Sequence, residues 1–267
     1  MSKVVLITGG SSGIGKSIGE FLHQNGYIVY GTSRNPDKAT QSIFPLIALD
    51  VRDVVSIHKA VNTIVQKSGT IDILINNAGV GITGPLEEIP SEEIKNNFET
   101  NFFGPIEVMK SVLPQMRKQQ SGLIINITSI AGFMGLPYRS VYSASKGALE
   151  LITESLRMEV KPFGIQITNI APGDFATNIA SGRYHAPLIT GSPYEKYYSN
   201  ILKMMNEHVN SGSNPMEMAE AVYKIIQNPN PKIHYKVGIF MQKFSIVLKR
   251  ILPDLLYEKL LMNHYKL

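Results

Sequence analysis

Short apolar runs alternate with amphipathic segments along most of the chain, and this alternation limits the possible folds more than any other feature. The first run, residues 4–8, is almost entirely apolar, which is typical of a strand buried on both faces. After it, Ile14, Ile18 and Phe21 follow the spacing of one helix face. Because the same order recurs, the sequence predicts an α/β fold, a Rossmann-type doubly wound parallel sheet of about seven strands with helices on both faces.

The predicted strands share runs of Val, Ile and Leu, and no linker or repeat interrupts their order. We therefore expect residues 1–267 to form a single dinucleotide-binding domain. Residues 174–214 break the pattern with Gly and Pro and are predicted to be a substrate lid, and residues 240–267 are predicted to form a C-terminal helical tail. The strands are expected at residues 4–8, 27–32, 46–49, 71–75, 123–127, 165–170 and 233–237.

A glycine-rich turn joins the first strand to the first helix. Glycines permit a tight turn and a close approach of the backbone, so the helix N-terminus can meet a pyrophosphate. Taken alone the motif is weak, and a turn without a ligand stays open as the alternative. The expected cofactor contacts in this turn are Gly9, Ser11, Ser12, Gly13, Ile14 and Gly15.

Tyr142 and Lys146 lie four residues apart on a helix predicted over residues 140–161, so they share one face. A phenol with its usual pKa of about 10 is a poor base at neutral pH, and a neighbouring cation lowers that pKa. Ser129 ends the fifth strand, where its hydroxyl is suited to hold a substrate oxygen against Tyr142. Such a tyrosine–lysine pair is common by chance, but in this combination it predicts a catalytic proton carrier.

With these motifs in chain order, the sequence resembles the short-chain dehydrogenase/reductase family, in its shorter branch. Three further stretches carry the resemblance: Asn76-Asn77-Ala78-Gly79 after the fourth strand, Asn101 within residues 100–104, and Pro172-Gly173 after the sixth strand. The likeness covers roughly residues 3–240 and leads us to expect conversion between a carbonyl and an alcohol.

The resemblance also implies roles for single residues. It makes Asn101, Ser129, Tyr142 and Lys146 the catalytic set, with Lys146 also holding the nicotinamide ribose and the backbone at Asn101 anchoring a water in the proton relay. The further cofactor contacts that it implies are Asn77, Ala78, Gly79, Tyr142, Lys146, Pro172, Gly173 and Thr177.

The end of the second strand bears on the choice of cofactor. A carboxylate there would bind the adenosine ribose and repel a 2′-phosphate, but the chain has Ser33 and Arg34 and no acid before Asp37. Arg34 can bind a phosphate through two hydrogen bonds, so we expect NADP(H), with a solvated surface arginine as the alternative. Asp50 and Val51 look like the family's adenine contacts, although Asp50 would serve equally as a helix N-cap.

The predicted substrate site has apolar walls. The loop over residues 130–138 is apolar, and the expected substrate contacts are Ser129, Phe133, Tyr138, Tyr142 and Phe175. Few charges and many apolar groups favour a lipophilic ketone or aldehyde over a sugar or an acid. The tail loosely resembles that of steroid- and retinoid-active members; it can instead cover the sheet edge, make a subunit contact or, as the least favoured alternative, rest on a membrane surface.

Composition excludes several other classes of protein. The chain has no cysteine, and its six histidines form no pairs at ligand spacing, so we expect no metal site. The net charge of +5 is scattered apart from a basic bias after Lys232, which argues against a nucleic-acid partner. We expect a cytoplasmic homodimer or homotetramer that acts on a small-molecule carbonyl or alcohol. A catalytically silent dinucleotide sensor, or an interaction protein on the same fold, is the alternative.

Overall fold

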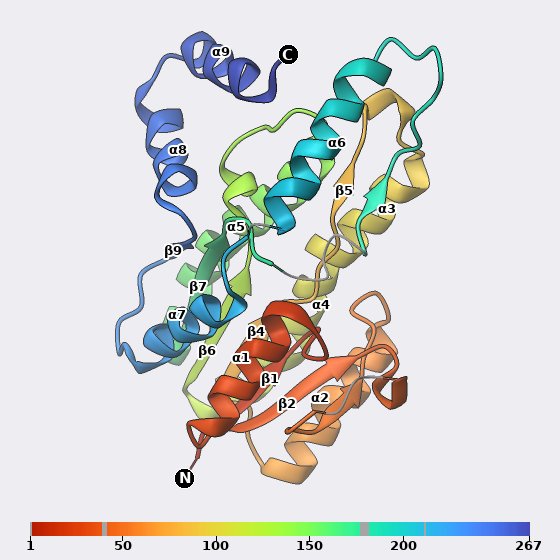
Figure 1. The fold of residues 1–267 in the computed structure, drawn as a ribbon. Helices are drawn as coiled ribbons and strands as arrows, with labels where there is room; N and C mark the ends of the chain where they lie inside the picture. The colour runs from red at the N-terminus through yellow and green to blue at the C-terminus, as the bar shows by residue number, and fades with distance from the viewer. Residues whose placement is uncertain (1, 39–41, 177–181, 211) are drawn as a thin grey trace.

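A parallel sheet of seven strands forms the centre of the molecule (Figure 1). The structure, a computed structural model, describes residues 2–38, 42–176, 182–210 and 212–267, with only the backbone for 206–210. The strand order is β3-β2-β1-β4-β6-β7-β9, and every neighbouring pair is parallel. The strands are β1 (Val4–Ile7), β2 (Ile28–Ser33), β3 (Leu46–Ala48), β4 (Ile73–Asn76), β6 (Gly122–Ile127), β7 (Ile165–Pro172) and β9 (His234–Val237).

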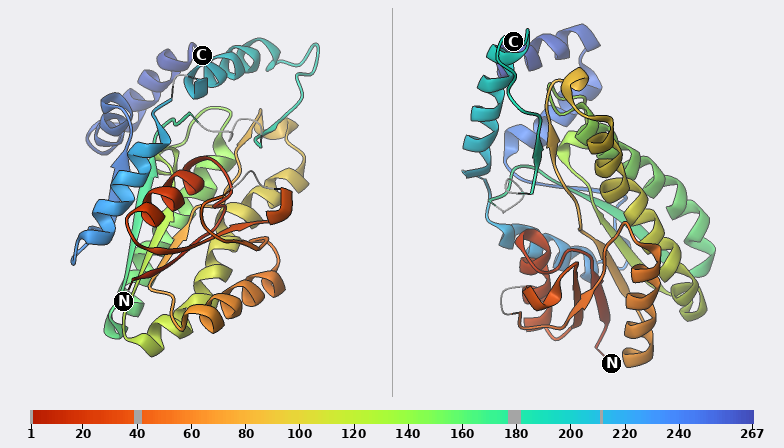
Figure 2. Two further views of the ribbon diagram at one scale, coloured as in Figure 1. Left: turned by 60° about the horizontal axis from the view of Figure 1, so that its bottom comes forward. Right: turned by 90° about the vertical axis from the view of Figure 1, so that its right-hand side faces the viewer.

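Helices cover both faces of this sheet, as the sequence predicts (Figure 2). The first strand shows why its residues are all apolar: Val4 and Leu6 belong to the core on one face, whereas Val5 and Ile7 belong to the core on the other. Helices α1 (Gly13–Gln24) and α7 (Pro215–Gln227) cover the Val5 face. The Leu6 face is covered by α2 (Val54–Ser68), α4 (Gly104–Gln119) and α5 (Ser140–Val160).

The order of the strands reverses at β1, whose neighbours are β2 on one side and β4 on the other. At such a point the connections that follow the two neighbouring strands run to opposite faces of the sheet, which opens a crevice at the carboxyl ends of the strands. Open α/β sheets bind their ligands in this crevice. The glycine turn after β1 and the Asn76-Asn77 stretch after β4 both lie at this crevice.

A smaller layer lies beyond the carboxyl end of the sheet. Strands β5 (Ile82–Thr83) and β8 (Tyr184–His185) form a parallel pair, and α6 (Glu195–Asn210) packs on it through Tyr198, whose hydroxyl is 3.1 Å from the carbonyl oxygen of Thr83. The tail forms α8 (Phe240–Ile251) and α9 (Asp254–Tyr265) at the same end of the molecule as α6 (Figures 1 and 2). The remaining elements are α3 (Ser91–Phe98), the π-helical turn η3 (Glu99–Phe103) and the 3₁₀ turns η1 (Pro36–Lys38), η2 (Leu86–Glu88), η4 (Ile130–Phe133) and η5 (Lys161–Phe163).

Among the described residues, no helix is both long enough and apolar enough to cross a bilayer.

Candidate active site

A cavity of about 610 Å³ lies at the carboxyl ends of β1, β2, β4 and β7. A second cavity of about 660 Å³ lies at the opposite edge, where the chain enters the strands, and Lys3, Asp72 and Gly164 line it. The first is the candidate site, because ligands of such sheets bind at the carboxyl ends of the strands. Most of the predicted cofactor residues line it: Gly9, Ser11, Ser12, Gly13, Ile14, Ser33, Arg34, Asp50, Val51, Asn77, Ala78, Gly79, Tyr142, Lys146 and Pro172.

Two predicted cofactor residues, Gly15 and Gly173, are not among the lining residues of this cavity. A Cβ atom on Gly15 would lie 2.3 Å from the carbonyl oxygen of Gly9, so this glycine lets α1 approach the turn. A Cβ atom on Gly173 would lie 1.9 Å from Oε1 of Gln242, so this glycine makes room for the tail. Thr177 lies outside the residues that the structure describes.

Hydrogen bonds from Asn77 and Ala78, which follow β4, hold the glycine turn in place. Gly9 and Gly13 have φ values of +65° and +52°, which favour glycine. The Asn77 side chain donates to the carbonyl oxygens of Thr8 (3.0 Å) and Gly9 (3.1 Å), and the backbone N–H of Ala78 donates to the Thr8 hydroxyl (3.1 Å). The turn that opens α1 is therefore braced at the cavity wall, as a pyrophosphate site requires.

Lys146 is buried beside Tyr142 at the cavity wall. Its ammonium group donates to the carbonyl oxygen of Ile127 at 2.9 Å. Burial lowers the pKa of Lys146 to about 8, while the charge of Glu150 acts in the opposite direction. With a pKa of about 8, Lys146 is mostly cationic at neutral pH, and it lies one helical turn beyond Tyr142 on α5.

Asn101 lies in the π-helical turn between α3 and α4, and its side chain is fully engaged. Oδ1 accepts from the backbone N–H of Val80 (2.9 Å), and Nδ2 donates to the Val80 carbonyl oxygen (2.8 Å). A Cβ atom on Gly79 would lie 3.2 Å from Asn101 Oδ1 and 3.3 Å from Lys146 Nζ. The lack of a side chain at Gly79 thus allows the loop after β4 to lie against both residues.

The structure places the predicted substrate residues at different depths. Ser129 is buried at the start of η4, where its hydroxyl accepts from the backbone N–H of Ala131 at 3.1 Å, and it is not among the lining residues. Tyr138 stacks on Tyr198 with ring centroids 5.5 Å apart. Phe175 is only 4% exposed and belongs to the core between the sheet and α7, so it packs in that core and does not line the cavity.

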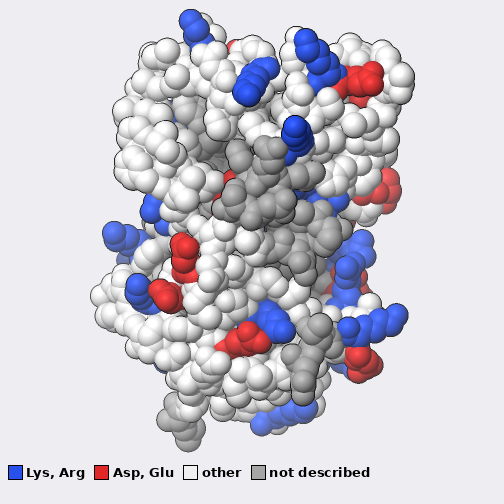
Figure 3. All heavy atoms as spheres, in the orientation of Figure 1, with Lys and Arg blue, Asp and Glu red and all other residues white. Residues whose placement is uncertain are grey.

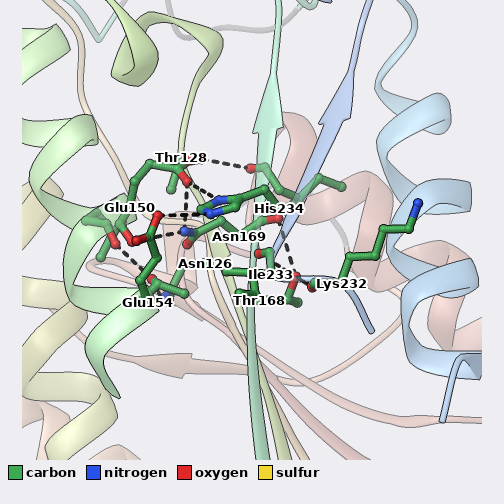
Figure 4. Close-up of polar contacts among 12 residues, drawn as sticks. Asn126, Thr128, Glu150, Glu154, Thr168, Asn169, Lys232, Ile233 and His234 are labelled. Atoms are coloured by element: carbon green, nitrogen blue, oxygen red, sulfur yellow. Dashed lines mark hydrogen bonds and ion pairs between the residues drawn. The ribbon is translucent and has the colours of Figure 1, made fainter. Parts of the chain in front are cut away.

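A buried acid lies one turn beyond Lys146, and sequence reasoning missed it. The Glu150 carboxylate accepts hydrogen bonds from the Thr128 hydroxyl, from Asn169 Nδ2 (2.8 Å) and from His234 Nδ1 (2.7 Å), and the other nitrogen of His234 lies 3.0 Å from Glu154 (Figure 4). The hydrogen bond to Glu150 raises the pKa of His234, although burial opposes the shift. The four-residue spacing from Lys146 was the one available signal, because His234 is far away in the sequence.

The adenosine end of the cavity carries two arginines. Arg52, which sequence reasoning also missed, pairs with Asp50 at 3.2 Å. Burial raises the pKa of Asp50, but the hydrogen bonds and charge of Arg52 outweigh it, so the pKa lies below its usual value. Arg34 and Ser33 line the same wall. No ion pair of Arg34 is found in the part of the chain that the structure describes, although its charge contributes, after that of Arg52, to the lowered pKa of Asp50.

Two further arginines lie close to Tyr142. The Arg139 guanidinium group lies 5.4 Å from the centre of the Tyr142 ring. Arg183 packs over Gly81, and its Nη1 is buried without a hydrogen-bond partner among the described residues. Burial, followed by the charge of Arg139, lowers the pKa of Arg183. The Arg183 Nη1 group suits an oxygen-bearing ligand, because a buried donor without a partner is costly.

Comparison with known proteins identifies the chain. A family model described as short chain dehydrogenase matches residues 3–187, more than half of the sequence. The protein belongs to the short-chain dehydrogenase/reductase family. It is therefore an oxidoreductase of that type. The predictions of the family and of a Rossmann-type fold are both confirmed.

Related short-chain dehydrogenases cover nearly the whole chain. A 3-ketodihydrosphingosine reductase of Bacteroides thetaiotaomicron is 42% identical over 94% of both chains, and an uncharacterized oxidoreductase, YusZ, of Bacillus subtilis is 35% identical over 97% of both. Among solved structures, a short-chain dehydrogenase from Streptomyces avermitilis has 29% identity and a TM-score of 0.83, and covers 100% of this chain and 96% of its own. ElxO with NADP bound has 28% identity and a TM-score of 0.72, over 89% and 97%. These likenesses support a nicotinamide dinucleotide as the cofactor.

Proposed function

We propose that this short-chain dehydrogenase uses NADP(H) to interconvert a lipophilic ketone or aldehyde and its alcohol, with Tyr142 as the general acid and base. The observation that carries the proposal is the pairing of Tyr142 with a buried, cationic Lys146 on one face of α5, at the wall of the cavity. The catalytically silent alternative is less favoured because Asn101, Ser129, Tyr142 and Lys146 are all present.

The residues would act together on the carbonyl oxygen. A bound nicotinamide dinucleotide would supply the hydride. Tyr142 would donate its hydroxyl proton as negative charge develops on the substrate oxygen, and the Lys146 ammonium group would lower the cost of the phenolate that remains. Ser129 would hold the substrate oxygen by donating its hydroxyl proton, since the hydroxyl oxygen only accepts from Ala131 N–H, and the backbone at Asn101 would hold a water of the proton relay.

Two features support NADP(H) over NAD(H). Arg34 and Arg52 bring positive charge to the adenosine end of the cavity, and the nearest acid there, Asp50, already pairs with Arg52. A 2′-phosphate would find a cation in Arg34 and a hydroxyl donor in Ser33. The solved structure of a relative, ElxO, holds NADP, which supports the same choice of cofactor. A preference for NADP(H) usually goes with reduction of the carbonyl.

The proposed lipophilic substrate would enter beneath residues 174–214, which we take to be a lid over a single dinucleotide-binding domain. Of the described part of this segment, Tyr184 lines the cavity, whereas the buried Tyr198 and the edge-on Tyr194 pack on Tyr138 in a neighbouring core cluster. An aromatic lining of this kind favours a substrate with a long apolar part. The name of the 42% identical relative, 3-ketodihydrosphingosine reductase, points in the same direction.

We further propose that the protein is a homodimer or homotetramer, joined through its long helices. Leu151 and Met158 lie seven residues apart on the outer face of α5, and both are well exposed. A pair of large apolar side chains at that spacing is typical of a subunit contact. A light-scattering mass equal to the single-chain mass of 29.5 kDa would contradict this proposal.

The test is to follow NADPH oxidation with ketones of increasing chain length, including 3-ketodihydrosphingosine. Each methylene that enters an apolar pocket contributes up to ~0.8 kcal/mol, so kcat/KM is expected to rise about three- to fourfold per added methylene until the pocket is full. A flat series, or a preference for small charged carbonyl compounds, would contradict the lipophilic substrate and leave the Tyr142 chemistry in place.

A further inference from the structure

The first tail helix, α8, exposes its apolar side. Phe240, Phe244, Val247 and Ile251 are all exposed and follow the spacing of a single helix face. The Phe240 and Phe244 rings stack with centroids 5.5 Å apart. On the opposite side of α8, Ile246 is buried. An amphipathic helix normally turns its apolar face to the core, so an outward apolar stripe indicates a partner for that surface.

The second tail helix extends this surface, and we call the two together the tail face. Its exposed apolar residues are Phe240, Met241, Phe244, Val247, Ile251, Leu255, Leu256, Leu260 and Met262. Figure 3 shows that the surface over α8 and α9, at the upper left, is largely uncharged. Single exposed apolar side chains are ordinary, but nine of them on two consecutive helices indicate a protein or membrane contact.

Residues 232–267, which comprise β9 and the tail, carry the whole net charge of the protein. Seven of the 26 Lys and Arg residues but only two of the 21 Asp and Glu residues lie in residues 232–267. The other 231 residues therefore have 19 charges of each sign and are neutral overall. Exposed basic residues of the tail include Arg250, Lys259 and Lys266, beside the apolar stripe.

The tail face borders the substrate side of the candidate site. Ile246 of α8 and Tyr257 of α9 pack on Ile130 and Met134 of the loop that follows Ser129. Gln242 of α8 donates to Asp174, at the start of the proposed lid, at 2.7 Å. The tail helices therefore connect the tail face to the loop after Ser129 and to the first residue of the proposed lid.

We propose that the tail face docks on an anionic lipid bilayer. The apolar side chains of α8 would enter the boundary between headgroups and acyl chains, while Lys243, Arg250 and Lys259 would meet lipid phosphates. The charge favours this occupant over a second copy of the chain, because a symmetric contact would bring the basic residues that flank the two apolar stripes close together. Supply of a lipophilic substrate by the bilayer rests on the proposed function, but docking itself does not.

The test is sedimentation of the full-length protein with vesicles of phosphatidylcholine alone or with about a third phosphatidylglycerol. At low salt the wild type is expected to bind the anionic vesicles at least ~10-fold more tightly than the neutral ones, and added salt should remove this difference. The double variant Phe240→Ser/Ile251→Ser should lose at least ~10-fold in binding. Thermal melting of each variant checks that it is folded.

A matched control comes from two residues outside the tail, Val55 on α2 and Leu86 on η2. They are 76% and 59% exposed, against 71% for Phe240 and 68% for Ile251. The variant Val55→Ser/Leu86→Ser removes a comparable exposed apolar fraction elsewhere on the molecule, so it should bind vesicles like the wild type.

Three outcomes would overturn the proposal. They are absence of binding to either vesicle, equal loss of binding in the α8 variant and the control variant, and a light-scattering mass that falls in the α8 variant but not in the control, which would make a second copy the occupant. Failure of docking is distinguishable from failure of the proposed function, because NADPH oxidation with a short water-soluble ketone needs no vesicles. Vesicle binding without any ketone reduction would contradict the proposed function alone.

Discussion

Replacement of Arg34 by Ala should change the cofactor preference of the protein. Arg34 lines the adenosine end of the cavity, and its guanidinium group is available there because Arg52 is already paired with Asp50 at 3.2 Å. A hydrogen bond to a charged group contributes about 1.5–3 kcal/mol. Since about 1.4 kcal/mol corresponds to a factor of ten, Arg34→Ala should weaken NADPH binding ~10- to 150-fold and leave NADH binding nearly unchanged.

The assay is titration calorimetry of the wild type and of Arg34→Ala with each cofactor. Arg117→Ala is the control for the loss of one positive charge, because Arg117 lies over Phe163 and is not among the lining residues of the cavity. It should leave the affinities for both cofactors as in the wild type. Equal affinities of the wild type for both cofactors, or an equal loss of both in Arg34→Ala, would refute the reasoning.

Two further variants test the construction of the site. The pKa of His234 is raised in the folded protein by Glu150. This pair therefore stabilises the fold fully below the unfolded pKa of about 6.5 and loses its contribution as pH rises through the folded pKa. His234→Gln should lower the free energy of unfolding in denaturant by ~1–2 kcal/mol at pH 6 and by less at pH 9, and a loss that does not depend on pH would argue against the ion pair. Gly15→Ala should destabilise the protein by ~1–3 kcal/mol and weaken NADPH binding, because the new Cβ would lie 2.3 Å from the Gly9 oxygen. Gly135→Ala is the control and should have neither effect, because its new Cβ would have no heavy atom within 4 Å. Similar effects at both glycines would count against the bracing of the turn.

The central sheet could be predicted because burial on both faces leaves a clear mark on the sequence. Every residue of β1 is apolar because alternate side chains enter the two cores. The predicted strands agree with the observed ones to within two residues at their ends. The pair β5 and β8 escaped prediction because each strand has only two residues, too few for a period to appear.

The site was predictable where its residues follow strands and helix turns in chain order. The glycine turn, Asn77 and the Tyr142–Lys146 pair all reach the same cavity, because parallel strands end at one edge of the sheet. Partnerships across long stretches of sequence were not predictable: Glu150 and His234 are 84 residues apart and meet only through the packing of α5 on β7 and β9. Phe175 was expected at the substrate but is in the core, because apolar character alone does not distinguish a cavity wall from a core.

The most direct test of the account compares the wild type with Tyr142→Phe in NADPH-dependent reduction of a lipophilic ketone. The ring and its packing remain in this variant, and only the hydroxyl that would donate the proton is lost. The account predicts a fall in kcat of at least ~10²-fold, with NADPH binding unchanged. Turnover close to that of the wild type would contradict the assignment of Tyr142 and, with it, the proposed mechanism.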